Sequence, residues 1–481
     1  MHSRTSLRCL PILANFDVIS IRSGLRGTKT VYQHRLNTTS ARSVSDASSS
    51  PPPLTSPSDQ RSALARLPTT GIVRSLILGS FLASPLLFNP GLAFLQRITR
   101  SKSLLLNPDR NWLLRAVIKP LIYDQFCAGT HEAEIRKRVA AIRDLGFSGV
   151  LLAYGKEIQI YEKNNTSAEQ VVAASKHDEE LELWKKGNLQ TLDMLEENDV
   201  LAMKFSGAGI FTVDAMLKNE PPSTQMLDTL DAIAQAAARK KCRIIVDSEQ
   251  QSIQKSIDRW TIDWMRKYNR GDRPVIINTL QAYLKESRDK LTYQLGLAEK
   301  EGWTLAIKLV RGAYMSNDRR ELIHDTKPET DQSYNSIVHD VLTQSLPGFD
   351  RQKFPKMTIF LAGHNQQSVD KATSLVEKLD RDGKLNIVPE FGQLQGMADD
   401  LGCRLLNWNE NRVSSNELRP HCKVYKYMTW GSTQECMEYL VRRAVENRGA
   451  ADRMKDDMAA MYSELKTRMV DALMGRKART N

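Results

Sequence analysis

The sequence predicts an α/β fold in which eight parallel strands close into a (β/α)8 TIM-type barrel, preceded by an N-terminal helical arm. From about residue 143, short and nearly continuous apolar runs alternate with longer segments, as expected of parallel strands that are buried on both faces. There are eight such runs, which is the number that closes a barrel. An open doubly wound sheet is the alternative fold.

Residues 1–60 are expected to form a mitochondrial transit peptide and a disordered linker. Up to about residue 45 the chain is rich in Arg and Ser and poor in acidic residues, and SARSVSDASSSPPPLTSPSD follows. A merely disordered basic tail is the alternative. Residues 61–130 are expected to be the helical arm, and residues 131–481 the barrel with a C-terminal helix.

Residues 75–96 contain no charged side chain and are long enough to suggest a transmembrane helix. However, Pro85 and the run Asn89-Pro90-Gly91 are expected to interrupt a helix. We therefore expect a buried or interfacial helical arm, with a membrane-spanning helix as the alternative.

The strands that follow are short apolar runs, each separated from the next by a segment of helical length. They are expected at residues 149–154, 200–205, 242–247, 274–279, 304–310, 357–363, 385–391 and 422–428. Intervening segments such as SIQKSIDRWTIDWMRKY and QQSVDKATSLVEKL repeat apolar residues at the period of a helix. A last helix is expected after Ser432-Thr433-Gln434-Glu435, which fits a capping box.

Composition argues against several classes of function. The net charge is +12, but acidic residues are interleaved with the basic ones, so no nucleic-acid surface is expected. The six cysteines and eight histidines lack metal-ligand spacing, so neither a metal site nor a disulfide framework is expected. Gly207-Ala208-Gly209 is not a dinucleotide-binding fingerprint, because position 212 is Thr. An affinity for an anionic membrane or an acidic partner stays open.

In a parallel barrel, the polar residues at the C-terminal ends of the strands meet at one mouth, where an active site is expected. The candidates are Lys204, Asp247, Glu249, Gln281, Lys308, Arg311, His364, Asn365, Glu390 and Tyr427. A lysine within an apolar strand, as at positions 204 and 308, is costly to bury unless it is paired. Asp247 could instead cap the next helix, and His364 could be an ordinary loop histidine.

The last predicted helix contains two adjacent arginines, Arg442 and Arg443, in YLVRRAVENR (439–448). Apolar residues recur on one face of this helix, and Tyr439, both arginines and Glu446 fall on the other. By itself this pattern is typical of a solvated surface helix, with Arg442 and Glu446 as an i, i+4 pair.

Several stretches, in order and spacing, resemble the core motifs of the mitochondrial proline dehydrogenase (proline oxidase) family in a fungal-like form. They are KLVRGAYM (308–315), AGHNQQSV (362–369), EFGQLQGMAD (390–399) and VYKYMTWGSTQECMEYLVRRAVENR (424–448), with IIVDSEQ (244–250) and NTLQAYLKES (278–287) upstream. The match covers roughly residues 140–450. The resemblance implies a distorted (β/α)8 barrel that binds FAD without a Rossmann domain.

The resemblance also implies a reaction. L-Proline would be oxidised to Δ1-pyrroline-5-carboxylate by hydride transfer to FAD, and ubiquinone would reoxidise the flavin, in the first step of proline catabolism to glutamate. The enzyme would contact the inner mitochondrial membrane peripherally from its matrix side. Pyrroline-5-carboxylate dehydrogenase activity is not expected, because no second catalytic domain follows the barrel.

Residue roles follow from the matched positions. Substrate contacts are implied for Lys204, Tyr314, Tyr427, Tyr439, Arg442 and Arg443, since guanidinium groups bind a carboxylate bidentately. Asp247 matches the family's active-site aspartate and is expected to pair with Lys204. Lys308 matches a basic position near flavin N5, where a cation stabilises the reduced ring.

FAD contacts are implied for Ser248, Gln281, Arg311, Gly312, Ala313, Gly363 and His364, and for Glu446, which could instead anchor the arginine pair. At Gly312 the backbone is expected to approach the cofactor closely. Met315 and Gly363 are less typical of the family than their neighbours. Two rival functions stay open: a barrel flavoprotein for another cyclic amine such as hydroxyproline, and an inactive barrel kept as an interaction protein.

Overall fold

The computed structural model describes residues 62–101, 103–156, 174–315, 317–415, 419–449 and 451–475. The transit peptide and linker expected at residues 1–60 therefore lie outside the described residues. The side chain of Glu446 also lies outside them, although its backbone is part of a helix.

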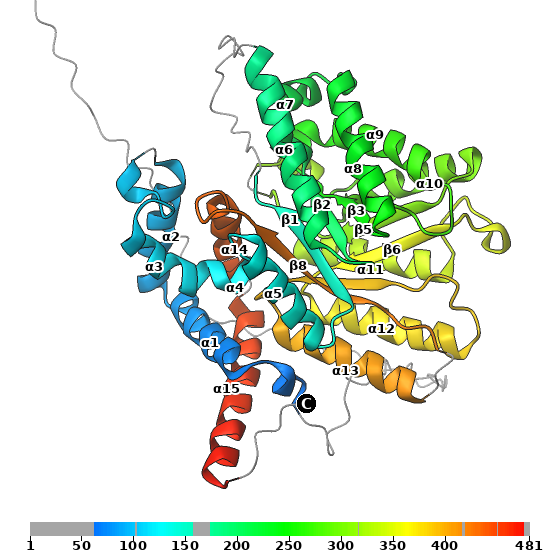
Figure 1. The fold of residues 1–481 in the computed structure, drawn as a ribbon. Coiled ribbons are helices and arrows are strands. Elements are labelled where there is room, and N and C mark those ends of the chain that lie inside the picture. Colours follow the sequence, from blue (N-terminus) through cyan, green and yellow to red (C-terminus); the bar gives the residue numbers. More distant parts are fainter. Residues whose placement is uncertain are drawn as a thin grey trace, which may run out of the picture. The chain divides into compact units, whose positions relative to one another are not determined.

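Eight parallel strands close into a barrel, in which each strand pairs with its neighbours in sequence and β1 pairs with β8 (Figure 1). The strands are β1 Gly149–Tyr154, β2 Val200–Met203, β3 Arg243–Val246, β4 Ile276–Gln281, β5 Leu305–Val310, β6 Met357–Ala362, β7 Glu390–Leu394 and β8 Val424–Trp430. The predicted (β/α)8 class is confirmed, and the open doubly wound sheet is excluded.

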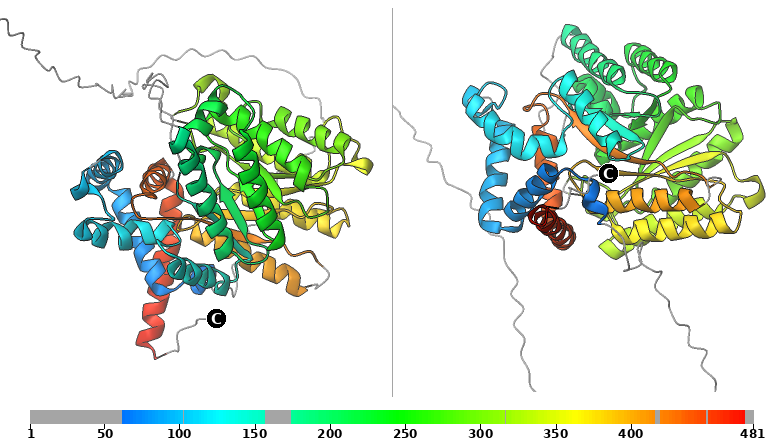
Figure 2. Two further views of the ribbon diagram at one scale, coloured as in Figure 1. Left: turned by 45° about the horizontal axis from the view of Figure 1, so that its top comes forward. Right: turned by 60° about the horizontal axis from the view of Figure 1, so that its bottom comes forward.

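Helices wrap the outside of the barrel (Figure 2). They are α5 Glu132–Asp144, α6 Ala174–Met194, α7 Ile210–Leu217, α8 Thr224–Arg239, α9 Gln251–Tyr268, α10 Ser287–Glu301, α11 Lys327–Thr343, α12 Gln366–Arg381 and α13 Asp399–Ser415. Two C-terminal helices, α14 Met437–Gly449 and α15 Ala451–Leu473, follow the last strand and pack mainly against the N-terminal arm. The two stretches whose periodicity predicted helices form most of α9 and the greater part of α12, and each buries its apolar face against the strands.

The core has two apolar layers, one on each side of the barrel wall. The inner layer contains Leu151, Val200, Ile245, Ile277, Ala306, Phe360 and Tyr425, and the larger outer layer lies between the strands and the helices. Side chains alternate along a strand, so a residue two positions beyond an inner one also points inward. This rule directs Asp247, Lys308 and Tyr427 toward the barrel mouth.

The predicted position of the seventh strand, residues 385–391, is wrong by several residues, because β7 begins at Glu390. Pro389 has no N–H to donate to a sheet, so the strand starts after it. Glu390 therefore lies at the amino end of the barrel and not at its mouth. There its carboxylate forms an ion pair with Arg243 at 2.7 Å.

The N-terminal arm consists of short helical segments that pack beside the C-terminal helices (Figure 2). They are η1 Ala63–Arg66, α1 Thr69–Ala83, α2 Pro85–Arg100, η2 Leu104–Leu106, α3 Trp112–Ile118, η3 Lys119–Tyr123 and α4 Asp124–Phe126. The break predicted at Pro85 is confirmed, since the helices on either side of it are bent by 97°. In the described part of the chain no single helix is long and apolar enough to cross a membrane, although this bent pair meets the criterion jointly.

The second break, predicted at Asn89-Pro90-Gly91, is wrong, because α2 continues through Pro90. A proline at this position removes one backbone hydrogen bond from the helix. The buried side chains of Phe88, Leu95 and Ile98 lie on the same helix and hold it against the protein. Packing of this kind contributes more to helix stability than one hydrogen bond does.

Candidate active site

Asp247, which directly follows β3, is at the centre of a polar group in the barrel mouth. Its side chain is buried, and it forms an ion pair with the ammonium of Lys308 on β5. The hydroxyl of Tyr427 on β8 donates to the other carboxylate oxygen at 2.7 Å. The prediction that strand-end residues meet is therefore confirmed for these three side chains. Asp247 is not the cap of the next helix, because Gln250 occupies that position.

Lys308 is fixed by two further features of its surroundings. It is only 5% exposed, and its ammonium lies 5.6 Å from the centre of the Tyr427 ring. A buried ammonium is tolerated only when a carboxylate compensates for its lost hydration, and Asp247 supplies that charge. The barrel mouth thus contains a positive charge in a fixed position.

Helix α14 brings Tyr439 and Arg443 to the same region. The capping box predicted before it is confirmed, since Glu435 N donates to Ser432 Oγ at 3.2 Å and Ser432 N to Glu435 Oε2 at 2.8 Å. Tyr439 is 5% exposed and Arg443 is 6% exposed, with the guanidinium carbon 5.0 Å from the Tyr439 ring centre. The interpretation of this face as solvated is therefore wrong for both residues.

Tyr427 connects the α14 region to the barrel interior. It packs against the inner apolar layer and also against the cluster that contains Tyr439 and Leu440 of α14. The cation of Arg443 and the Asp247–Lys308 pair therefore lie on elements that meet at one tyrosine. Arg442 is half-buried on the same helix.

Two other expected substrate residues are near strand ends as predicted. Lys204 follows β2 and precedes the short helix η4 (Phe205–Ala208), and its carbonyl accepts from Trp184 Nε1 at 3.1 Å. Tyr314 is buried in the loop after β5. Their contacts with a substrate stay predictions, as does the expected pairing of Lys204 with Asp247.

Comparison with known proteins decides the family. Residues 135–456 match the model of the proline dehydrogenase family. The chain belongs to this family. The resemblance inferred from the sequence motifs is thereby confirmed.

Individual relatives agree with this assignment. The chain is 34% identical to the probable mitochondrial proline dehydrogenase of Schizosaccharomyces pombe over 250 residues. This aligned region covers 50% of this chain and 49% of that protein. It is 32% identical to the mitochondrial proline dehydrogenase 1 of Homo sapiens, over 52% of this chain and 40% of that one. Identity to proline dehydrogenase 1 of Arabidopsis thaliana is 27%, over 86% of each. The chain thus spans half or less of the length of the first two relatives.

A solved structure shares the fold. The crystal structure of proline utilization A from Bdellovibrio bacteriovorus, inactivated by N-propargylglycine, superimposes with a TM-score of 0.59 at 16% identity. The superposition covers 80% of this chain and 41% of that one. At this identity the likeness supports the barrel architecture alone.

Two features fit the cofactor expected for a proline dehydrogenase. Gln281, the last residue of β4, is buried, and its amide oxygen has no hydrogen-bond partner among the described residues. A buried acceptor without a partner is costly, and an N–H group on a ligand ring would satisfy it. Its amide nitrogen donates to the carbonyl of Glu249 at 3.4 Å.

The second feature is a surface hollow of about 770 Å³ between α11 and α12. Its lining includes Asp331 and Ser368, and Arg311 donates to these two residues at 2.8 and 2.7 Å. Lys327 and Lys371 also line it. Lys327 is ion-paired with Asp331, so the lining is mixed in charge. The size of the hollow and its nearness to Arg311 suit part of a large ligand with an anionic group, such as a dinucleotide.

Other residues expected to contact the cofactor are Ser248, Ala313, Gly363 and His364, with Gly312 described below. His364 Nε2 accepts from the backbone N–H of Leu394 at 3.0 Å, so this loop histidine has a structural contact of its own. A side chain added at Gly363 would approach Arg311 at 3.4 Å. Ser248 is half-buried and Ala313 is exposed. Their cofactor contacts stay predictions.

Gly312 has a structural reason that the sequence did not indicate. Its φ is +144°, and a Cβ at this position would lie 2.2 Å from the ring of Tyr283. Tyr283 donates from its hydroxyl to Asp318, which also accepts from the backbone of Gln251 at 2.9 Å. Burial raises the pKa of Asp318 and of Tyr283. Tyr283 thus holds the loop after β5 in place. Its only indication in the sequence was that it lies within the matched motif NTLQAYLKES.

Gly312→Ala is expected to destabilise the protein by about 3 kcal/mol, because overpacking against Tyr283 adds to an unfavourable backbone conformation. Gly302→Ala is the matched control, since Gly302 has a φ of +70° but nothing within 4 Å of an added Cβ. That variant should lose only about 1 kcal/mol. Urea denaturation measures both values, and equal losses would show that the Tyr283 contact is unimportant.

Proposed function

We propose that this protein uses bound FAD to oxidise L-proline to Δ1-pyrroline-5-carboxylate, and passes the electrons to ubiquinone at the matrix side of the inner mitochondrial membrane. The observation that carries the proposal is the fixed group Asp247–Lys308–Tyr427, with the buried Arg443 on α14 against Tyr439, whose apolar cluster Tyr427 also contacts. Membership of the family and the names of the mitochondrial relatives support it.

Substrate binding follows from charge and shape. A proline carboxylate needs a fixed cation, and a guanidinium binds it through two parallel hydrogen bonds. Arg443 and its neighbour Arg442 are the proposed partners, together with Lys204. The rings of Tyr427 and Tyr439 form apolar walls for the small pyrrolidine ring and help to exclude water. Tyr314 lies in the loop that completes this region.

The proposed cofactor is held by Gln281 and Arg311, with backbone and side-chain contacts from Ser248, Gly312, Ala313, Gly363 and His364. When bound, FAD supplies a hydride acceptor for the substrate carbon next to nitrogen. Lys308 is the cation that stabilises negative charge on the reduced ring. Asp247 keeps Lys308 and Tyr427 in place and balances the positive charge of the site.

Hydride leaves the ring carbon readily only when the nitrogen lone pair is free, so the substrate amine must lose its proton.

Bound FAD should make the purified protein yellow, and anaerobic L-proline should bleach its flavin absorption. Hydroxyproline should give a lower kcat/KM, because its hydroxyl must fit the wall of Tyr427 and Tyr439. A folded protein that takes up no FAD, or whose flavin L-proline does not reduce, contradicts the proposal.

A further inference from the structure

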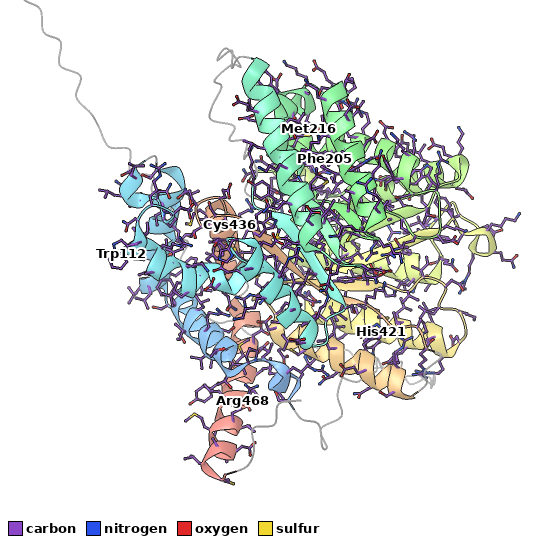
Figure 3. The ribbon with its side chains drawn as sticks, viewed as in Figure 1. Trp112, Phe205, Met216, His421, Cys436 and Arg468 are labelled. Carbon is purple, nitrogen blue, oxygen red and sulfur yellow. The ribbon has the colours of Figure 1, made fainter. Side chains whose placement is uncertain are left out.

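The outer side of the N-terminal arm is apolar. Its large exposed side chains include Leu86, Phe94, Leu105, Trp112, Leu113 and Val117, which we call the arm face. Leu86 is 87% exposed, Leu105 is 77% exposed and Trp112 is 74% exposed. Figure 3 shows Trp112 on the side of the arm that points away from the barrel. So many large apolar side chains exposed within one short part of the chain indicate an interaction site.

Helix α2 has apolar side chains both on its buried side and on its exposed side. Leu95 and Ile98 on its inner side are buried in the cluster that contains Tyr439 of α14. Leu86 and Phe94 on the same helix are exposed. An ordinary surface helix has polar residues on its outer side. On α2, large apolar residues are also exposed on the side that the described residues do not cover.

The charges around the arm face favour one kind of partner. Arg97, Arg110 and Arg115 are exposed there. The only acidic residue between positions 86 and 121 of the sequence is Asp109. Its carboxylate accepts from the backbone N–H groups of Thr433 and Gln434 at 2.9 and 3.2 Å. The one acidic side chain is thus bonded to the protein, while the arginines are exposed beside apolar residues.

Exposed leucine, phenylalanine and tryptophan next to arginine are typical of a surface that lies in the headgroup region of a lipid bilayer. Within the described residues no single helix is long and apolar enough to cross a membrane. The bend of 97° between α1 and α2 turns the chain instead of extending it into one span. The geometry therefore suits attachment to one leaflet.

We propose that the arm face docks on an anionic lipid bilayer, with Leu105, Trp112 and Leu113 entering the headgroup region. The inference rests on the proposed function for its purpose, since ubiquinone is dissolved in the membrane. Ile118 of α3 lies in the cluster that contains Tyr439 of α14. Docking through α3 would therefore place the bilayer close to the helix that carries Arg443.

Flotation of the full chain with lipid vesicles tests the proposal. The vesicles contain phosphatidylcholine and phosphatidylglycerol in a 70:30 ratio, and pure phosphatidylcholine vesicles serve for comparison. The test variant is L105E/W112E/L113E. The matched control is L183E/L227E/Y293E, which changes three exposed apolar residues on α6, α8 and α10, on the outside of the barrel.

Wild type and control should bind the anionic vesicles equally, and the arm variant should need at least ten times more lipid for half-binding. Neutral vesicles should bind the wild type at least several-fold more weakly. The basic residues 1–60 are common to all three proteins, so their own attraction to lipid cancels in the comparison. Absence of wild-type binding, equal binding of arm variant and control, or equal binding to both lipids would overturn the proposal.

Two further measurements separate this inference from others. If the wild type does not bind vesicles but is a dimer that L105E/W112E/L113E converts to a monomer, the arm face covers a second copy, and lipid docking is wrong. Bleaching of the flavin by L-proline in solution should be the same in the arm variant and the wild type. If the wild type binds vesicles but L-proline does not bleach its flavin, the proposed function fails while the docking surface stands.

Discussion

Replacing Arg443 with Met is expected to raise the KM for L-proline by about 100-fold while the flavin content stays near that of the wild type. Removing one member of a buried charge pair costs about 2–5 kcal/mol, and each 1.4 kcal/mol is about tenfold in affinity. Arg443 is buried beside Tyr439 in an apolar cluster. A methionine is similar in length and suits such surroundings, so the fold should be retained.

Steady-state kinetics with a soluble electron acceptor measures this change. Arg266→Met is the matched control, because Arg266 pairs with Glu301 on the outside of the barrel, where its loss should leave the KM unchanged. Arg443→Lys should recover only part of the affinity, since an ammonium cannot bind a carboxylate bidentately. An unchanged KM in the methionine variant would mean that Arg443 serves only to hold α14.

The strands of this protein could be located from the sequence because buried parallel strands are apolar along their whole length, which few other segments are. The error at β7 shows the limit of that signal. LNIVPEF reads as one apolar run, but Pro389 cannot donate a sheet hydrogen bond, and the strand begins after it. Pro90 shows the opposite case. The proline predicted a break, yet burial of the flanking side chains keeps α2 continuous.

The residues of the candidate site that lie near strand ends could be predicted from the sequence. The contacts between loops that are distant in the sequence could not. Position toward the carboxyl end of a predicted strand indicated Asp247, Lys308 and Tyr427, but not that all three would be joined directly. The contact of Tyr283 with Gly312 and Asp318 joins two loops whose meeting depends on the closed barrel. The periodicity of α14 fits a solvated face, and only the surrounding elements show that Arg443 is buried.

Replacing Asp247 with Asn is expected to slow flavin reduction by about 100-fold to 1000-fold and to destabilise the protein by about 3 kcal/mol. Asparagine has nearly the same shape, but it removes the charge that compensates the buried ammonium of Lys308. It also accepts a weaker hydrogen bond from Tyr427. Both side chains that line the proposed substrate site would lose their fixed positions.

A second buried ion pair separates the chemical effect from the loss of stability. Lys426 and Asp399 lie 2.7 Å apart and are buried to a similar degree, but Lys426 points to the outer side of the barrel wall, next to Phe147. Asp399→Asn should therefore cost a similar free energy of unfolding, measured by urea denaturation, while anaerobic stopped-flow reduction by L-proline stays at the wild-type rate. If Asp247→Asn also reduces its flavin at that rate, Asp247 is only the counter-ion of Lys308, and the chemistry depends on other residues of the mouth.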